Sequence, residues 1–373
     1  MALAENEWEV MKNEVYAKFT EKTGIKVNGI QVEHADMEGK VESLIQAGKS
    51  ELDVVAPDNM LLSGMATKGL IKDLSQYQDI IPEEIPENLY EGFRIDGKLF
   101  YMLYKANIKL AFYNEDKFNE YGITPPATWD ELEKMAKLFY EKEGTGRYVY
   151  QGSQGAAATA TIFEMIRAAG GDPLTLNDAG SYEAFKFLQE IYPYTSSEVI
   201  RTNFASMNQM LASGTVYYGE NWPFCANVVV KDNGKENIKA YPGPAGPKGI
   251  SKVLGGNLLA VVSNTKNEEA CIQFIEYMMS KETQEILTSQ LGWSPIRKDA
   301  LGAIDEWQKP YMEAINEAMQ YAEPRPIVAY WSDVDKAIND AYNEIVINGG
   351  KDIQGILDKY HEDIEAAKAK TVK

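Results

Sequence analysis

The sequence predicts an α/β fold organised as about two domains, and three observations support this. The chain has 373 residues, more than a single hydrophobic core usually spans. Helix patterns alternate with short apolar strand patterns near its start, which is typical of α/β proteins. The alternation then breaks at separate places that suit crossings between domains. With 45% apolar and 25% charged residues, the composition is that of an ordinary globular protein.

The first elements alternate regularly. Apolar residues recur at spacings of three and four through residues 8–19, which predicts an amphipathic helix. The segment "TGIKVNGIQV", residues 23–32, has a glycine stop followed by a short strand pattern. Residues 37–50 again show a helix pattern, and "LDVVAP", residues 52–57, is a short apolar run ended by proline. This order predicts buried strands and a largely parallel sheet.

The first break in the alternation follows Asp96-Gly97, a dipeptide typical of hairpin turns. A long strand-prone run continues from there to Tyr113, with a polar interruption at residues 105–107. Such a run can leave one sheet and enter another. Downstream, Thr128 has the position of a helix N-cap and Glu131 completes a capping box, so a helix is predicted to begin there.

The second break is "YPGPAGPKG", residues 241–249, which is too rich in proline and glycine for a regular element. A strand pattern follows over residues 251–265, interrupted by Gly255-Gly256, and then a helix pattern over residues 267–280. Helical segments end the chain from about Val334. Crossings between domains are predicted near Asn107, near Gly255 and around residues 303–310. Several crossings imply discontinuous domains with a hinge and a cleft, a favoured place for ligands.

Several classes of function are disfavoured by the residues. The formal net charge of −19 repels phosphate backbones and anionic membranes. Glycine-rich phosphate-binding motifs are absent, and the two histidines belong to no HExxH motif. We therefore expect no cofactor, no metal site and no catalytic residues. The 56 acidic residues leave one enzyme hypothesis open, a glycoside-active enzyme that uses a pair of carboxylates.

The sequence also bears on compartment. It has no stretch of about 18 apolar residues that could span a bilayer, and its start lacks the features of a secretory signal. The chain is thus either cytosolic or lacks an exported protein's leader. Its two cysteines, Cys225 and Cys271, form no CxxC motif, and two buried free thiols are favoured over a disulfide.

Aromatic residues make up 11% of the chain, and several stand in loops rather than in helix stripes. Flat aromatic rings match the C–H faces of sugar rings, while polar neighbours can bind the hydroxyls. Glycine, proline or polar neighbours favour a ligand cleft for Trp222 and Trp331. Trp293 fits core and cleft equally well. Core or surface packing is favoured for three further residues: Trp8, Trp129 and Trp307.

At this point the order of motifs resembles a known family. The stretches "GKLFYMLYKANIKLAFYN", "GITPPATWDEL", "GENW", "GPAGPKG", "GGNLLAVVSNTKNEEACIQFIEYMMS", "GWSPIRKDAL" and "RPIVAYWSDV" occur in the order found in the family 1 extracellular solute-binding proteins of ABC importers. This carbohydrate-binding group includes the maltose-binding proteins. The likeness covers nearly the whole chain.

The resemblance implies a type II periplasmic-binding-protein-like fold, with two α/β lobes, a hinge of about three crossovers and a central ligand cleft. The N-terminal lobe would comprise residues 1–106 and 256–305, and the C-terminal lobe residues 107–255 and 306–373. It implies a monomer that captures a mono- or oligosaccharide by hinge closure and delivers it to the transmembrane subunits of an ABC permease. It also implies an extracellular place, as a membrane-anchored lipoprotein or a periplasmic protein.

The resemblance carries ligand-binding roles onto particular positions. Polar contacts are expected after the strand "LDVVAP", at the first crossover and at the return crossover, and aromatic contacts are expected in the later loops. The expected set is Asp58, Asn59, Tyr104, Asn107, Gln154, Thr161, Glu220, Trp222, Gly256, Asn257, Trp293, Tyr330 and Trp331.

Two departures from the family and one further alternative remain. The family's first strand is apparently missing before the first helix. Met60 and Leu61 are apolar where maltose-binding proteins tend to carry an acidic and a basic contact, so maltose specificity does not follow. Glu220 beside Trp222 leaves open a cationic ligand such as a polyamine, held by charge and cation–π contact.

Overall fold

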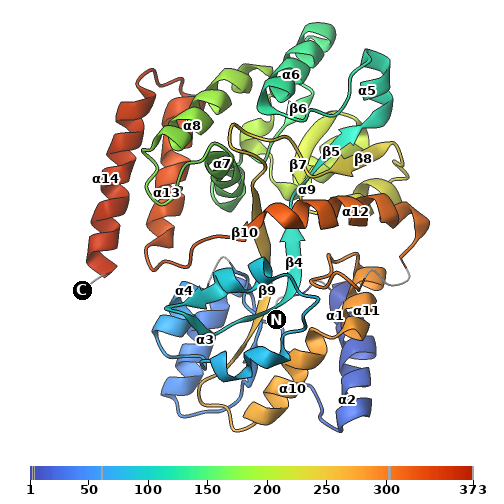
Figure 1. The fold of residues 1–373 in the computed structure, drawn as a ribbon, viewed down its shortest axis with the longest axis vertical. Helices are drawn as coiled ribbons and strands as arrows, with labels where there is room; N and C mark the ends of the chain where they lie inside the picture. The colour runs from blue at the N-terminus through green and yellow to red at the C-terminus, as the bar shows by residue number, and fades with distance from the viewer. Residues whose placement is uncertain (2, 4, 60–61, 301–303, 372–373) are drawn as a thin grey trace. The chain divides into compact units, whose positions relative to one another are not determined.

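The structure is a computed structural model that describes residues 1, 3, 5–59, 62–300 and 304–371 (Figure 1). Met60 and Leu61 lie outside the described residues. The chain forms two compact units. Unit 1 comprises Met1–Asn107, Leu254–Glu306 and Glu323–Ile327, and unit 2 comprises Ile108–Val253, Trp307–Ala322 and Val328–Lys373.

The division differs from the expected lobes by one or two residues at most boundaries and by a whole segment in its last part. Residues 323–327 belong to unit 1, although the sequence placed the whole segment 306–373 in the second lobe. The reason is a short strand, β10 (Ala322–Pro324), which lies beside β9 (Lys252–Val261) in the sheet of unit 1. A three-residue strand leaves no periodic signal in a sequence, so it was not anticipated.

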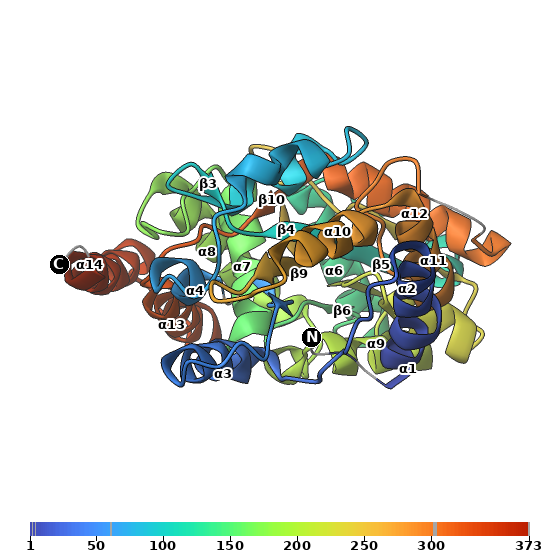
Figure 2. The same ribbon diagram turned by 90° about the horizontal axis from the view of Figure 1, so that it is seen from below.

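Unit 1 is built on a four-stranded sheet in the order β1-β9-β10, with β4 also paired to β9. Here β1 is Val54–Val55 and β4 is Met102–Ile108. The helices of this unit are α1 (Glu5–Val10), a π-helical turn (Met11–Tyr16), α2 (Ala17–Thr23), α3 (His34–Gln46), α4 (Ser63–Thr67), α10 (Glu268–Met278) and α11 (Lys281–Leu291). Figures 1 and 2 show α1 beside α11.

The predicted strand over residues 23–32 is not formed. The segment after α2 is extended but pairs with no strand of the described residues. One of its few backbone bonds runs from the Val32 amide to the Met1 carbonyl, at 3.0 Å. A strand pattern becomes a strand only where a partner supplies the ladder of hydrogen bonds, and that partner is not visible in local sequence.

The hairpin predicted at Asp96-Gly97 is confirmed. Strands β2 (Arg94–Ile95) and β3 (Lys98–Leu99) pair antiparallel across these two residues. Asp96 has φ 52° and Gly97 has φ 75°. Two successive positive φ angles are what a type I′ turn requires, and Asp-Gly adopts them at low cost.

Unit 2 contains a second four-stranded sheet in the order β6-β7-β5-β8. Its strands are β5 (Leu110–Asn114), β6 (Tyr148–Val149), β7 (Tyr218–Asn221) and β8 (Ile238–Tyr241). The central strand β5 runs antiparallel to both β7 and β8, and β6 is parallel to β7. In unit 1, β1 and β9 are also antiparallel. The expectation of a largely parallel sheet was therefore wrong for the three antiparallel pairs described here. It had extrapolated the helix–strand alternation of the first 57 residues to the whole chain.

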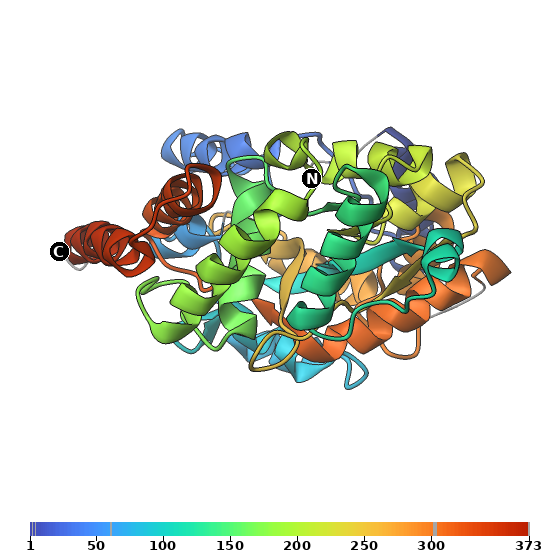
Figure 3. The same cartoon turned by 90° about the horizontal axis from the view of Figure 1, so that it is seen from above.

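Helices surround the sheet of unit 2. They are α5 (Glu115–Tyr121), α6 (Trp129–Glu143), α7 (Ala156–Ala168), α8 (Ala179–Ile191), α9 (Phe204–Ser213), a π-helix (Asn227–Asp232), α12 (Lys309–Ala318), α13 (Trp331–Tyr342), a second π-turn (Asn343–Ile347) and α14 (Ile353–Thr371). Figures 1 and 3 show α13 and α14 side by side.

Local signals fixed the start of α6 correctly. The Thr128 hydroxyl accepts a hydrogen bond from the Glu131 amide at 3.3 Å, and the Glu131 carboxylate accepts one from the Ala127 amide at 2.7 Å. The first bond satisfies an amide that the first turn of a helix leaves unpaired, and the second ties the Glu131 side chain to the residue before the N-cap. The two cysteines, Cys225 and Cys271, are free and buried, as expected.

Short 3-10 helices also occur among the described residues. They are Ser75–Ile80, Glu87–Leu89, Glu91–Phe93, Tyr192–Tyr194, Val199–Arg201, Glu306–Gln308 and Met319–Tyr321. Among the helices of the described residues, none has both the length and the apolar character needed to cross a membrane.

Candidate ligand-binding site

Trp222 stands where strand β7 ends, and its backbone is fixed by a buried amide. The Asn221 Oδ1 atom accepts hydrogen bonds from the Trp222 amide and from Gln151 Nε2, both at 2.9 Å. The Asn221 Nδ2 atom donates to Asn208 Oδ1 at 2.6 Å and to the Phe204 carbonyl at 2.9 Å. Because all these partners are intramolecular, the position from which Trp222 projects is set before any ligand arrives.

Trp331 begins helix α13, and the structure brings it to the same place as Trp222. Both indoles are half-buried and pack against one buried cluster formed by Ala160, Phe163 and Val253. The Phe163 and Trp331 rings meet edge to face, with centroids 5.8 Å apart. Two aromatic residues more than 100 positions apart in the sequence thus share one support within unit 2, and both are only partly buried.

A second buried network holds the start of α7 against α13. Asn339 Nδ2 donates to Thr159 Oγ1 at 2.8 Å, and Asn339 Oδ1 accepts from the Gly155 amide at 2.7 Å. The Thr159 hydroxyl in turn donates to Asp335 Oδ1 at 2.6 Å. This network joins the helix that carries Trp331 to the helix that carries Phe163, so it positions the aromatic pair.

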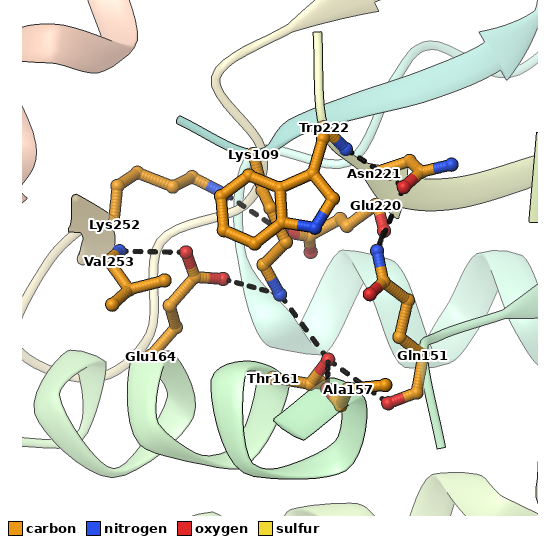
Figure 4. Close-up of polar contacts among 10 residues, drawn as sticks. All are labelled: Lys109, Gln151, Ala157, Thr161, Glu164, Glu220, Asn221, Trp222, Lys252 and Val253. Carbon is orange, nitrogen blue, oxygen red and sulfur yellow. Dashed lines mark hydrogen bonds and ion pairs between the residues drawn. The ribbon is translucent and has the colours of Figure 1, made fainter. Parts of the chain in front are cut away.

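Two ion pairs lie in the same unit, one fully buried and one with a partly exposed glutamate, and Figure 4 draws their contacts. Lys109 Nζ is 3.0 Å from Glu164 Oε2, and Lys252 Nζ is 2.8 Å from Glu220 Oε2. Lys109 precedes β5, Glu164 lies on α7, Glu220 on β7 and Lys252 at the start of β9. We call these four side chains the charge quartet. Buried charges persist in proteins only where such partners compensate them.

The charges of the quartet act on the ionisation of Glu220 and of Lys252. Burial opposes the ionisation of Glu220, but the neighbouring Lys252 and Lys109 outweigh it and lower the pKa of Glu220. Burial likewise opposes the charged form of Lys252, while Glu220 and Glu164 outweigh it and raise the pKa of Lys252. Both side chains of this pair are therefore charged at neutral pH.

Three other expected residues also lie in unit 2. Thr161 is buried, and its hydroxyl lies 3.2 Å from the Gln151 carbonyl and 3.3 Å from Lys109 Nζ, so it is occupied internally. Gln154 is exposed just before α7. Tyr330 is half-buried immediately before Trp331, and its carbonyl accepts the backbone bonds that open α13.

In unit 1, Tyr104 and Trp293 pack against each other and are only 1% and 6% exposed. Trp293 Nε1 donates to Glu7 Oε1 at 2.9 Å, and the Lys105 ammonium lies 3.7 Å from the centre of the Trp293 ring. Lys105 also pairs with Glu7 at 3.3 Å. Packing and these bonds account for the burial of Tyr104 and Trp293.

The remaining expected residues of unit 1 cluster at the crossings. Asn59 is buried, and its amide donates to the Leu254 carbonyl. Asp58 and Asn257 form an isolated antiparallel bridge. Gly256 has φ 137°, and an added Cβ would stand 2.0 Å from the Lys105 carbonyl oxygen, so only glycine fits. Asn107 is half-buried, with no side-chain bond to another described residue, and ends unit 1.

Unit 1 also contains a cavity of about 620 Å³, between the unpaired segment 25–32, strand β1 and helix α10. None of the residues expected to bind ligand lines it. In the described parts of the chain, no group of three or more histidine, cysteine and acidic residues is arranged to hold a metal ion.

Sequence reasoning missed most of the residues that support the site: Lys109, Gln151, Glu164, Asn208, Asn221 and Lys252. Two of them left a signal, because Lys109 and Lys252 each interrupt or open an apolar strand run. A lysine within a buried strand requires a buried partner. The partners are far away in the sequence and only the fold brings them close.

The chain is also similar to known proteins. A family model described as bacterial extracellular solute-binding protein matches residues 14–314. The chain belongs to this family. The resemblance seen in its motifs is thus confirmed.

Among the relatives of this solute-binding protein is a putative binding protein of Brucella abortus (strain 2308), 23% identical, with 81% of this chain and 78% of the relative covered. Another is the spermidine/putrescine-binding periplasmic protein 1 of Haemophilus influenzae, 25% identical, with 77% and 72% covered. Both similarities extend over most of the two chains.

Solved structures agree with the fold. The sugar-binding protein MalE of Xanthomonas citri superposes with a TM-score of 0.86, at 19% identity, covering 100% of this chain and 97% of that one. Maltose-bound MalE3 of T. maritima gives 0.80, at 21% identity, with 98% of each chain covered. The solute-binding protein therefore has the type II periplasmic-binding-protein fold that the sequence predicted.

Proposed function

We propose that this solute-binding protein captures a mono- or oligosaccharide outside the cytoplasm for an ABC importer. The observation that carries the proposal is the pair of half-buried indoles, Trp222 and Trp331, supported by one buried cluster in unit 2. A sugar ring offers a flat C–H face to such indoles, and each aromatic contact adds about 0.5 to 1.5 kcal/mol beyond area burial.

Polar groups near the indoles can take up the hydroxyls of a stacked sugar. Gln154 is exposed, Glu220 is partly exposed, and Tyr330 directly precedes Trp331. The solved relatives support the same ligand class, because one is the sugar-binding protein MalE and another is MalE3 bound to maltose. The sugar ligand of this protein belongs to the proposal, as do the contacts expected from Asp58 and Asn107.

The remaining parts of the proposal concern partners and place. Members of the family deliver their ligands to ABC permeases, and we infer that the transmembrane subunits of such a permease are the partner here. We further propose a monomer that binds its sugar without transforming it, binds no nucleic acid, and is either periplasmic or anchored as a lipoprotein. The net charge of −19 supports the absence of nucleic-acid binding.

Titration of tryptophan fluorescence with glucose, maltose, cellobiose, xylobiose and diacetylchitobiose tests the proposal. We expect a saturable response to at least one sugar. Isothermal titration should then show that Trp222→Ala and Trp331→Ala each weaken binding about tenfold or more, because each removes a stacking face. Tyr140→Ala removes an exposed aromatic ring on α6 and should leave the affinity unchanged.

Two results would contradict the proposal. No response to any sugar would remove the sugar ligand, and unchanged affinity in both tryptophan variants would remove the indole pair from the site. Chromatography of an oligosaccharide after long incubation with the protein checks the enzyme alternative. Release of shorter sugars would show a glycoside-active enzyme instead of a receptor.

A further inference from the structure

The charge quartet contains one carboxylate with internal partners on both oxygens and one with a partner on a single oxygen. In Glu164, Oε2 pairs with Lys109 and Oε1 accepts the Val253 amide at 2.8 Å. Glu220 uses only Oε2, on Lys252, and within the part of the chain that the structure describes Oε1 has no hydrogen-bond donor. The Glu220 side chain is 20% exposed, against 6% for Glu164.

Glu220 lies close enough to Trp222 in the sequence for its Oε1 atom to serve as an acceptor for a ligand. Glu220 lies two residues before Trp222 on the strand that ends at the proposed stacking face. Its partner Lys252 directly precedes Val253, which belongs to the cluster that supports both indoles. A carboxylate oxygen accepts hydrogen bonds but cannot donate them, so it suits a hydroxyl group of a stacked ligand.

Lys252 and Lys109 determine whether the Glu220 carboxylate can also attract a cationic ligand. An isolated carboxylate beside an indole is an ammonium site, by charge and cation–π contact. Here two lysines neighbour Glu220, and the quartet of two lysines and two glutamates has no net charge. An incoming ammonium group would meet the charges of Lys252 and Lys109 as well as that of Glu220.

We propose that Lys252, through its pair with Glu220, is a specificity-determining residue that restricts this site to uncharged ligands. Glu220 Oε1 binds a hydroxyl of the ligand, and Lys252 cancels the charge that would otherwise recruit a cation. The inference rests on the proposed sugar-binding function and adds that the sugar bears no charge. It assigns the discrimination against polyamines to a residue that does not itself face the ligand, since the Lys252 side chain is only 3% exposed.

The test compares the wild type with Lys252→Met and Glu220→Gln, using isothermal titration with the best sugar of the panel and with spermidine. The wild type should not bind spermidine, and its sugar affinity should change less than about twofold between 50 and 500 mM NaCl, because salt screens only charged ligands. Lys252→Met exposes an uncompensated carboxylate, and we expect it to gain spermidine binding that weakens about tenfold over the same range.

Glu220→Gln should lower the sugar affinity about tenfold without creating spermidine binding, because it replaces a charged acceptor by a neutral one of the same shape. Lys359→Met is the matched control. Lys359 also pairs with a glutamate in unit 2, Glu344, at 2.9 Å, but its side chain is 57% exposed, and we expect no change in either affinity.

Circular dichroism and thermal unfolding establish that each variant is folded. If Lys252→Met does not fold, the double variant Lys252→Met/Glu220→Gln removes both charges of the pair together and should match Glu220→Gln. The wild type and Glu220→Gln test the exclusion of spermidine and the contact from Glu220 whether or not Lys252→Met folds. Spermidine binding by the wild type, or full sugar affinity in Glu220→Gln, would overturn the inference.

The outcomes separate this inference from the proposed function. A wild-type protein that binds no sugar refutes the proposed function. A wild type that binds sugar, together with a folded Lys252→Met variant that still ignores spermidine, refutes only the role of Lys252.

Discussion

Glu143 shows how strongly a few hydrogen bonds can shift the pKa of one carboxylate in this protein. Its Oε1 atom accepts bonds from the Tyr121 hydroxyl at 2.5 Å and from the Tyr217 hydroxyl at 2.9 Å, and Arg147 lies 3.0 Å from Oε2. These bonds, those of the tyrosines first, lower the pKa of Glu143 to about 2. Bonds to the ionised form favour ionisation in the folded state.

This pKa predicts an acid-dependent loss of stability. The folded pKa lies below the ordinary value of 4.5, so the contribution is complete above about pH 4.5 and disappears as the pH falls towards 2. Glu143→Gln should cost about 1 to 2 kcal/mol at pH 7 and flatten the decline below pH 4.5. Urea unfolding at pH 7, 4 and 3 measures this.

The control is Glu141→Gln, which changes an exposed residue of the same helix and should leave the stability unchanged. Parallel pH profiles for the wild type and Glu143→Gln would contradict the assignment.

Sequence context separated the tryptophans only in part. Glycine, proline and polar neighbours suggested incomplete burial of Trp222 and Trp331, and both are half-buried. Trp293 stands in a similar loop yet is buried, because Glu7, far away in the sequence, accepts its Nε1 hydrogen. Local neighbours report how regular the backbone is, whereas the burial of a side chain depends on distant residues.

At the scale of elements, helix α13 carries Trp331, one of the two proposed stacking residues, and Asn339 anchors this helix to α7. Asn339 is buried and bonds both to the amide of Gly155 and to the hydroxyl of Thr159. Asn339→Ala should lower stability by about 1 to 3 kcal/mol, because it leaves buried polar groups unpaired. It should also weaken sugar binding several-fold, since α13, which begins with Trp331, is then no longer held against the start of α7.

Thermal unfolding and isothermal titration measure the two effects. Lys336→Ala lies on the same helix with a side chain 75% exposed, and we expect it to change neither. Full sugar affinity in a destabilised Asn339→Ala variant would show that the anchor does not position Trp331.

The predictions from sequence were correct for elements with strong local signals. They were wrong for elements that depend on the pairing of strands from distant parts of the chain. The capped start of α6 and the Asp96-Gly97 hairpin were correct, since neighbouring residues determine both. The strand expected over residues 23–32 was wrong, and so was the parallel pairing expected for β1 with β9 and for β5 with its two neighbours, because both depend on which distant segments lie side by side.

At the scale of the whole molecule, the family's behaviour predicts a conformational response. Solute-binding proteins of this fold are expected to close on their ligand about the crossing segments, and binding can favour closure only through contacts that the closed state adds. We expect the radius of gyration from small-angle X-ray scattering to fall when the best sugar of the panel is added. A sugar without a fluorescence response serves as control, and an unchanged radius at saturation would contradict closure.

The way the chain alternates between its units also has a consequence for its synthesis. Unit 1 needs residues 254–306 and 323–327, and unit 2 needs residues from 328 onward. A ribosome adds about 5 to 20 residues per second, so for many seconds the nascent chain holds fragments of both units and all of neither. Neither unit can be completed until its most distant segment has emerged from the ribosome. The native structure of both units can therefore form only after about the last 50 residues have been synthesised.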